Sequence, residues 1–497
     1  MFSKILRKWK NLWSDAEDTG SAVVRGATLL FTTRMTIKVL QFVRTIILAR
    51  LLFPNDFGLF GMAAVSLGFV DTFFQSGFNA ALVREKGNVN EYLNSAWTTG
   101  VLRNAVLSVA IFFLAPLAGA FFHNETIVPF ARALALATFI AGFENIGIVL
   151  LQKEMRFNQN FRFNVSIVLL EVVSVIIAAF FLRNAWALVL GAIANRFFAT
   201  VLSYVFHPYR PKFEWNTKRI RHLFSYGRWV WAMSIIGYLV SQGDNITVGK
   251  MLAPADLGFY QAAFALALLP SGEIARSFGN ILFPLFSKIE NDKEFLRRSF
   301  IRVARIIFAI TIPASFGLLA LAPEIVSIIY GERWLGMVPI LSVLIFYGLI
   351  KSFEFVVNPL FLGVGKPKIS AASLFSQFAA MFVLIVPLTA RYGASGTAFA
   401  VLSGSIAAQG ILLFAIRREI GFGFSGLVET IWLPFLSAFL MYVALAGTKS
   451  LFPVLGAPGL FLSVLYGVGI YVAALFSLDF LFGKNMYNSV IWIKKNL

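Results

Sequence analysis

Four basic side chains recur through one apolar stretch of the sequence, RMTIKVLQFVRTIILAR at residues 34–50. Arg34 and Lys38 lie four residues apart, and Gln41 and Thr45 continue the same stripe at helical spacing. A cation at the centre of a membrane helix costs about 2.5–3.5 kcal/mol when it faces lipid, so this stripe should face protein or water. Cations that line an internal cavity bind anions. We therefore expect Arg34, Lys38 and Gln41 to contact a negatively charged substrate.

Three more cations lie inside apolar stretches and are further candidates for binding substrate: Arg132, Arg196 and Lys351. Lys351 lies three residues before Glu354, a spacing at which a cation and an acid on one helix neutralise each other. The sequence therefore leaves two roles open for Lys351, substrate binding and a structural ion pair.

A second group of charges predicts a gate or an ion-coupling site, and it consists of Arg44, Asp244 and Asp71. Arg44 and Asp244 are separated by 200 residues, which is also the offset of an internal repeat. An ion pair between them would hold the external side of a transport path closed, with H⁺ or Na⁺ as the coupling ion. The sequence equally allows each charge a separate partner in its own half of the chain, such as Asp71 for Arg44.

The composition indicates a polytopic membrane protein. The chain is 58% hydrophobic with a mean hydropathy of +0.78, against roughly 45–50% apolar residues in soluble domains. It has no Cys and three scattered His, so we expect no disulfide, no metal and no cofactor. The net charge of +19 suits cytoplasmic loops beside anionic membrane lipids and does not indicate nucleic acid.

Apolar stretches of about 20 residues predict an all-α fold of about fourteen transmembrane helices. Lys and Arg concentrate in alternate loops, which by the positive-inside rule places both termini in the cytoplasm. The predicted spans are 26–50, 57–83, 95–122, 127–151, 163–182, 185–206, 226–251, 257–287, 300–322, 336–363, 368–390, 394–416, 429–448 and 456–482.

An internal repeat divides these helices into two lobes. ARLLFPNDFGLF at 49–60 and GKMLAPADLGFY at 249–260 share a Pro-x-Asp-x-Gly core at a fixed offset. Six predicted helices separate the copies, so the two lobes form a parallel repeat. We expect the following domains: a cytoplasmic amphipathic segment at 1–25, an N-lobe at 26–206, a basic cytoplasmic inter-lobe loop at 207–225, a C-lobe at 226–420, and two C-terminal helices with a cytoplasmic end at 421–497.

Several segments resemble the Wzx-type polysaccharide exporters, a family of flippases, and its colanic-acid-exporter branch in particular. They are ILARLLFPNDFGLFGMAAVSLGFVDTFFQSGFNAALVREK (47–86), DNITVGKMLAPADLGFYQAAFALALLP (244–270), ILFPLFSKIEND (281–292) and NPLFLGVGKPK (358–368). This family belongs to the multidrug/oligosaccharidyl-lipid/polysaccharide superfamily. The resemblance implies a MATE-like fold of two six-helix lobes plus two C-terminal helices.

The same resemblance implies a function. Such proteins translocate undecaprenyl-diphosphate-linked oligosaccharide repeat units across the bacterial inner membrane, by alternating access, for exopolysaccharide, capsule or O-antigen biosynthesis. A polysaccharide polymerase and export machinery are the partners it implies. The family has no short catalytic signature, so the candidate residues above rest on their placement in the helices.

Three other functions remain open from the sequence. A multidrug antiporter or a lipid II flippase would share the fold, although cationic drugs would favour an acidic cavity. A membrane glycosyltransferase or polymerase would need a sizeable external loop with catalytic carboxylates, and the predicted external loops are short. No Walker-type phosphate loop is present. The sequence therefore predicts a transporter and not an enzyme.

Overall fold

The computed structural model describes residues 19–73, 90–154, 156–215, 234–235, 237–273, 282–283, 285–451 and 454–482. Within these ranges the regular structure is helical, without a strand, which confirms the predicted all-α class. The chain divides into two compact units. Unit 1 comprises the described residues of Met1–Leu52 and Ala63–Tyr238, and unit 2 those of Phe53–Met62 and Leu239–Leu497. Most of the expected amphipathic segment at 1–25 lies outside the described residues.

Nine helices in the described ranges are long and apolar enough to cross a membrane. Two further helices of the first half do not meet those criteria: α2 (Thr19–Leu51), which carries the cationic stripe, and α6 (Ile127–Ala141), which is short. The total of about fourteen spans therefore remains a prediction. The nine membrane-capable helices are α3 (Pro54–Phe73), α5 (Asn90–Phe122), α8 (Phe157–Leu182), α9 (Trp186–Phe206), α13 (Lys293–Ala320), α15 (Val338–Gly363), α16 (Pro367–Ile420), α17 (Phe424–Leu451) and α18 (Gly456–Phe482).

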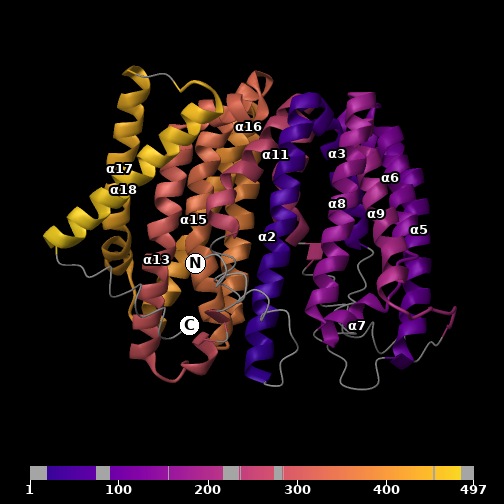
Figure 1. Ribbon diagram of the computed structural model, residues 1–497, viewed down its shortest axis with the longest axis horizontal. Coiled ribbons are helices and arrows are strands. Elements are labelled where there is room, and N and C mark those ends of the chain that lie inside the picture. Colours follow the sequence, from indigo (N-terminus) through magenta and orange to yellow (C-terminus); the bar gives the residue numbers. More distant parts are fainter. Residues whose placement is uncertain are drawn as a thin grey trace, which may run out of the picture. The chain divides into compact units, whose positions relative to one another are not determined.

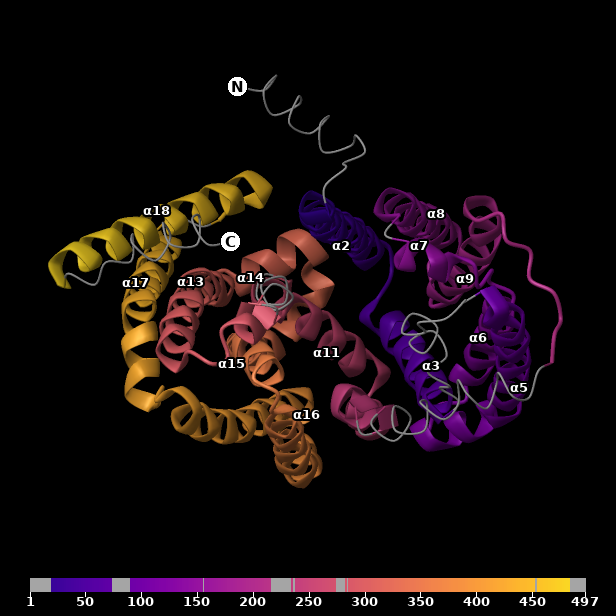
Figure 2. The same cartoon turned by 90° about the horizontal axis from the view of Figure 1, so that it is seen from below.

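Unit 1 is a bundle of helices, in which the order of neighbours differs from the order along the chain. Helix α2 packs against α8, α8 against α9, α9 against α6, and α6 against α5 (Figures 1 and 2). Leu107 and Ile111 of α5 pack with Ala135 of α6, and Phe163 of α8 packs with Ala199 of α9. These small contact groups hold α5, α6, α8 and α9 together, so the side chains of α2 are positioned mainly by its contact with α8.

The predicted span at 127–151 is interrupted in the structure. Helix α6 ends at Ala141, and a short helix α7 (Ile148–Lys153) follows after a turn. Asn145 is buried in this turn, where its Oδ1 accepts from the Gly147 backbone N–H at 2.9 Å. A buried Asn that bonds neighbouring backbone groups offers the chain an alternative to the helix, which explains the break.

Residues 207–215 form an extended segment bound to one end of unit 1, which we call the strap. The Tyr209 hydroxyl donates to Asn94 Oδ1 at 2.5 Å, and the Glu214 backbone N–H donates to Thr98 Oγ1 at 2.9 Å. Asn94 and Thr98 belong to the first turns of α5. The strap thus covers the first part of the predicted inter-lobe loop, of which residues 216–225 lie outside the described ranges.

His207 begins the strap and is buried against unit 1. Its Nδ1 accepts a hydrogen bond from the Tyr209 backbone N–H at 3.2 Å, so the neutral ring serves this contact. Burial lowers the pKa of His207; Arg156 and Arg210 lower it as well, and Glu154 opposes them. The folded state therefore favours the uncharged imidazole.

Unit 2 has the larger core. Helix α13 packs against α15 and α17, α15 against α16, and α17 against α18. Buried aromatic side chains from α13 and α15 form the centre of this core with a methionine of α17: Phe300, Phe308, Phe353, Phe361 and Met441. A helix α11 (Pro254–Ala267) also packs against α15.

Helix α16 has 54 residues and reverses direction at Gly393. A straight helix of that length would span about 80 Å, far more than a bilayer core of about 30 Å. Gly393 adopts φ 61° and ψ −145°, which is not helical, and Gly404 then packs against the backbone of Gln377. The hydroxyls of Thr389 and Thr397 lie 2.7 Å apart across this hairpin. The break falls between the two predicted spans at 368–390 and 394–416.

Candidate functional site

The predicted cationic stripe lies along helix α2, and its members differ in exposure. Arg34 and Lys38 are exposed in unit 1, whereas Gln41 and Arg44 are partly buried. The hydroxyl of Thr45, the last polar residue of the stripe, donates to the backbone carbonyl of Gln41 at 2.9 Å, so its hydrogen bond is made within the helix. Of the three stripe residues predicted to contact an anion, Arg34 and Lys38 are therefore exposed and Gln41 is partly buried.

Arg44 has an acidic partner inside unit 1. Its Nη1 lies 2.5 Å from Oε1 of Glu171, whose side chain is 6% exposed on α8. Because α2 packs against α8, this ion pair neutralises Arg44 and joins the two helices. The sequence allowed Asp71 as a partner of Arg44 in the same half of the chain, as the alternative to Asp244. In the structure Glu171 is the acid that pairs with Arg44.

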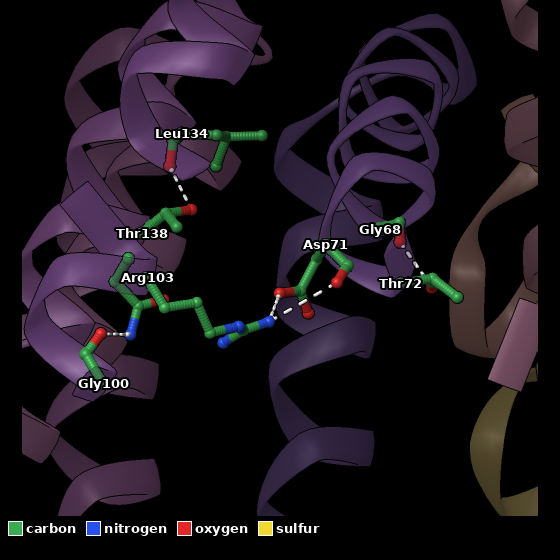
Figure 3. A network of polar contacts seen from close by, with 8 residues as sticks. Gly68, Asp71, Thr72, Gly100, Arg103, Leu134 and Thr138 are labelled. Carbon is green, nitrogen blue, oxygen red and sulfur yellow. Dashed lines mark hydrogen bonds and ion pairs between the residues drawn. The ribbon is translucent and has the colours of Figure 1, made fainter. Parts of the chain in front are cut away.

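Asp71 pairs instead with Arg103, as Figure 3 shows. Asp71 lies on α3 and Arg103 on α5, and the guanidinium also donates to the Asp71 backbone carbonyl at 3.4 Å. Thr72 beside it is buried and donates to the carbonyl of Gly68 at 2.8 Å. Two of the cations in the helices of unit 1 are thus neutralised by acids of the same unit.

Arg132 and Arg196 are both exposed, on α6 and α9. The guanidinium of Arg132 lies over the ring of Phe112, 5.0 Å from its centroid, which stabilises the cation without removing its charge. Arg196 interacts electrostatically with Glu144, which lies after the end of α6. The structure places these two cations on different helices from Arg34 and Lys38.

Lys351 is the predicted substrate-binding residue that lies in unit 2, and it forms the local ion pair that its spacing predicted. Its Nζ lies 2.6 Å from Oε2 of Glu354 and donates to Oε1 of Gln377 at 3.0 Å. Its side chain is largely buried. The predicted Lys351–Glu354 pair is confirmed. Gln377 was missed because it lies on α16, and nothing in the sequence relates it to α15.

Asp244 is buried in unit 2, on the helical residues 237–251. Its Oδ2 accepts from the hydroxyl of Tyr260 at 2.9 Å, and its Oδ1 accepts from the Asn245 backbone N–H at 2.8 Å. Tyr260 was not among the predicted residues, although it is the last residue of the second repeat copy at 249–260. Among the described residues, no group of three or more His, Cys, Asp or Glu is arranged to hold a metal ion.

Comparison with known proteins places the chain in a family. The sequence profile described as "Polysaccharide biosynthesis protein" matches residues 47–339, which is more than half of the chain. The chain belongs to the polysaccharide biosynthesis protein family. The predicted kinship with polysaccharide exporters is thereby confirmed, and this family member is a multi-pass membrane protein.

Relatives of the chain carry related names. The lipopolysaccharide biosynthesis protein WzxC of Escherichia coli K12 is 27% identical over 404 residues, which cover 80% of this chain and 81% of the relative. The teichuronic acid biosynthesis protein TuaB of Bacillus subtilis 168 is 23% identical and covers 66% of this chain and 68% of the relative. The succinoglycan biosynthesis transport protein ExoT of Rhizobium meliloti 1021 is 23% identical and covers 61% of this chain and 62% of the relative.

Solved structures show the fold of this polysaccharide biosynthesis protein. The lipid II flippase MurJ in an inward closed conformation has a TM-score of 0.71, is 17% identical, and covers 91% of this chain and 99% of its own. An inward-facing MATE-family transporter has a TM-score of 0.56 at 15% identity, and covers 80% of this chain and 98% of its own. The family member therefore shares the fold of these transporters, as the sequence predicted.

Proposed function

We propose that this protein is a flippase that moves undecaprenyl-diphosphate-linked oligosaccharide repeat units across the bacterial inner membrane for surface polysaccharide biosynthesis. It works by alternating access, with both termini in the cytoplasm. The observation that carries the proposal is the pair of exposed cations on α2, Arg34 and Lys38, in a chain of the polysaccharide biosynthesis family. The names of relatives such as WzxC and ExoT support the same biosynthetic role.

The diphosphate is the part of such a substrate that these cations bind. Each cation would cost about 2.5–3.5 kcal/mol at a lipid-facing helix centre, so their exposure favours an aqueous path over lipid. Arg34 lies seventeen residues before the end of α2 at Leu51, or about 25 Å from that end. That depth suits an anion entering from the cytoplasmic side. Gln41 follows on the stripe as a neutral donor.

Arg132 and Arg196 join this cationic surface in the proposal because both are exposed on helices of the same unit. For Lys351 the geometry favours the structural alternative, since Glu354 and Gln377 already bind its ammonium. The proposed substrate site therefore rests on unit 1 side chains.

Export of surface glycan in a deletion strain tests the proposal. Arg34→Ala and Lys38→Ala should each reduce export and cause lipid-linked repeat units to accumulate, at unchanged protein level in the membrane. Lys38→Arg should retain more export because it keeps the charge and can bind phosphate oxygens with two donors. Arg391→Ala, which removes another exposed arginine, is the matched control. Normal export by both Ala variants would refute the role of the stripe.

A lipid II flippase is the second candidate, and the MurJ fold is the observation that favours it. Complementation separates the two functions. Expression of this protein should not restore growth to a cell depleted of its own lipid II flippase. Its expression in a glycan-export mutant should restore the surface polymer. The reverse result would replace the proposed substrate. A multidrug antiporter is disfavoured because the exposed charges on the helices of unit 1 are mainly cationic.

The gate and the coupling ion remain proposals. Arg44 and Asp244 belong to different units, and each has partners within its own: Glu171 for Arg44, and Tyr260 for Asp244. An Arg44–Asp244 pair would then belong to one stage of the transport cycle, coupled to H⁺ or Na⁺. Arg44→Asp and Asp244→Arg should each impair export and should restore it when combined. A double variant as inactive as the single ones would rule the pair out.

A further inference from the structure

The two copies of the Pro-x-Asp-x-Gly repeat meet each other within unit 2. Gly58 of α3 lies against the backbone carbonyl of Pro254, and Gly258 of α11 lies against the backbone carbonyl of Pro54. The contact is reciprocal, because each glycine touches the proline that lies four residues before the other glycine. Reciprocal contacts of this kind are what a two-fold axis produces.

Equivalent residues also meet at the centre of this contact. A Cβ placed on Gly61 would lie 2.7 Å from Oε1 of Gln261, and Gln261 is the counterpart of Gly61 in the repeat. Small residues allow membrane helices to approach until their backbones touch. We call the contact of Pro54, Gly58 and Gly61 with Pro254, Gly258 and Gln261 the α3–α11 crossing.

The aspartates of the repeat fix where each crossing helix begins. Asp56 Oδ2 accepts from the Phe53 backbone N–H at 2.9 Å, and Asp256 Oδ2 accepts from the Ala253 backbone N–H at 3.2 Å. Such bonds secure the first turn of a helix, where backbone groups lack partners along the chain. The repeat thus serves one geometry: proline starts the helix, aspartate secures its first turn, and glycine permits the close approach.

The crossing is closely packed. Pro54, Gly58 and Gly258 are all buried. Trp334, which is 1% exposed, packs edge-on against Phe57 of α3 at 5.1 Å and Phe259 of α11 at 6.1 Å between ring centroids. Three aromatic rings from separate parts of the chain therefore fill the space beside the touching backbones. Close packing of this kind leaves few voids large enough for a water molecule.

We propose that the α3–α11 crossing is the outer seal of the transport path. The helix starts at Pro54 and Pro254 lie at the end that the distribution of Lys and Arg predicts to be external. A glycan that leaves outward must pass this end, so the crossing parts in each export cycle and closes again behind the substrate. This inference rests on the proposed flippase function.

Cross-linking tests whether the crossing parts. The chain has no Cys, so the pair Gly61→Cys/Gln261→Cys can be oxidised without background. Oxidation should reduce glycan export about tenfold or more, and reduction should restore it, because a disulfide holds the two helices together. Thr389→Cys/Thr397→Cys, which joins one hairpin to itself, is the matched control and should export normally. Unchanged export by the oxidised Gly61/Gln261 pair would overturn the proposal.

Thiol labelling tests the seal independently of export. A Cys at Met62, which is 1% exposed behind the crossing, should react slowly with an impermeant reagent added outside. Gly58→Ala forces a methyl group against the Pro254 backbone and should raise that rate about tenfold, as a shift toward the open state would. Gly447→Ala, whose new methyl meets no neighbour within 4 Å, should leave it unchanged.

These outcomes separate the two proposals. An unchanged labelling rate in the Gly58→Ala variant would overturn the seal even if the protein exports glycan. A raised labelling rate in the Gly58→Ala variant would support the seal. If, in addition, the protein without that substitution cannot restore export to the deletion strain, the flippase function would be refuted.

Discussion

Replacing Glu171 by Leu removes the carboxylate that neutralises Arg44 and should destabilise unit 1. Breaking a fully buried ion pair from one side costs about 3–5 kcal/mol, whereas exposed pairs are worth about 0.2–1 kcal/mol. Glu171 is 6% exposed but Arg44 is 32% exposed, so water compensates in part for the lost partner. We expect Glu171→Leu to lower the free energy of unfolding by about 2–3 kcal/mol, roughly a hundredfold in the equilibrium.

The opposite single variant should cost more. Arg44→Met leaves the carboxylate of Glu171 almost fully buried without a cation, so we expect a loss of at least about 3 kcal/mol. The double variant replaces the pair by two apolar side chains of similar size, which is often close to neutral, within about 1 kcal/mol. The two changes should therefore be strongly non-additive.

Unfolding by sodium dodecyl sulfate in mixed micelles, followed by circular dichroism, measures these free energies. The exposed pair Glu294–Arg298, 2.8 Å apart on α13, is the control, and removing either partner should cost less than about 0.5 kcal/mol. If the loss in the Arg44→Met/Glu171→Leu double variant equals the sum of the single losses, the two side chains do not interact. Helix α2 would then be held to α8 by apolar packing alone.

Three further predictions follow from the strap, the topology and Lys351. Burial lowers the pKa of His207, so the imidazole takes up a proton more readily in the unfolded chain than in the folded one. The melting temperature should therefore be highest above about pH 6.5 and fall toward about pH 5. His207→Gln should reduce that fall. A Cys at Asn124 should react with an impermeant thiol reagent from outside and a Cys at Lys212 should not, whereas the reverse pattern would contradict cytoplasmic termini. Lys351→Met should lower the melting temperature and Glu354→Leu should restore part of it, with export retained; loss of export in the restored double variant would return Lys351 to the substrate site.

Local patterns in the sequence were sufficient to predict the all-α class, many of the long helices and one ion pair. Apolar stretches of about 20 residues allow few alternatives to a membrane helix. The i, i+3 spacing of Lys351 and Glu354 brings the two charges together on any helix, whatever surrounds it. The cationic stripe of α2 is also a local pattern; Arg34 and Lys38 are exposed in unit 1, and their role in binding a substrate remains a proposal.

The partners of the other charges could not be predicted, because they depend on which helices pack together. Arg44 and Glu171 are 127 residues apart, and Arg103 is 32 residues from Asp71. Helical periodicity shows which face a side chain occupies but not which helix covers that face. Asn145 is a different case: a polar residue between two glycines within an apolar stretch was a local signal for the break after α6.

The α3–α11 crossing also constrains the order in which the protein can assemble during translation. All the residues that bind the strap precede residue 216, so unit 1 can close its strap as soon as that segment is made. The start of α3, by contrast, belongs to unit 2 and waits for α11, which is synthesised 200 residues later. At about 5–20 residues per second that delay is about 10–40 s. During this time two helix turns with an open glycine face are exposed to other nascent helices, so a chain arrested before α11 should be a favoured substrate for membrane chaperones and proteases.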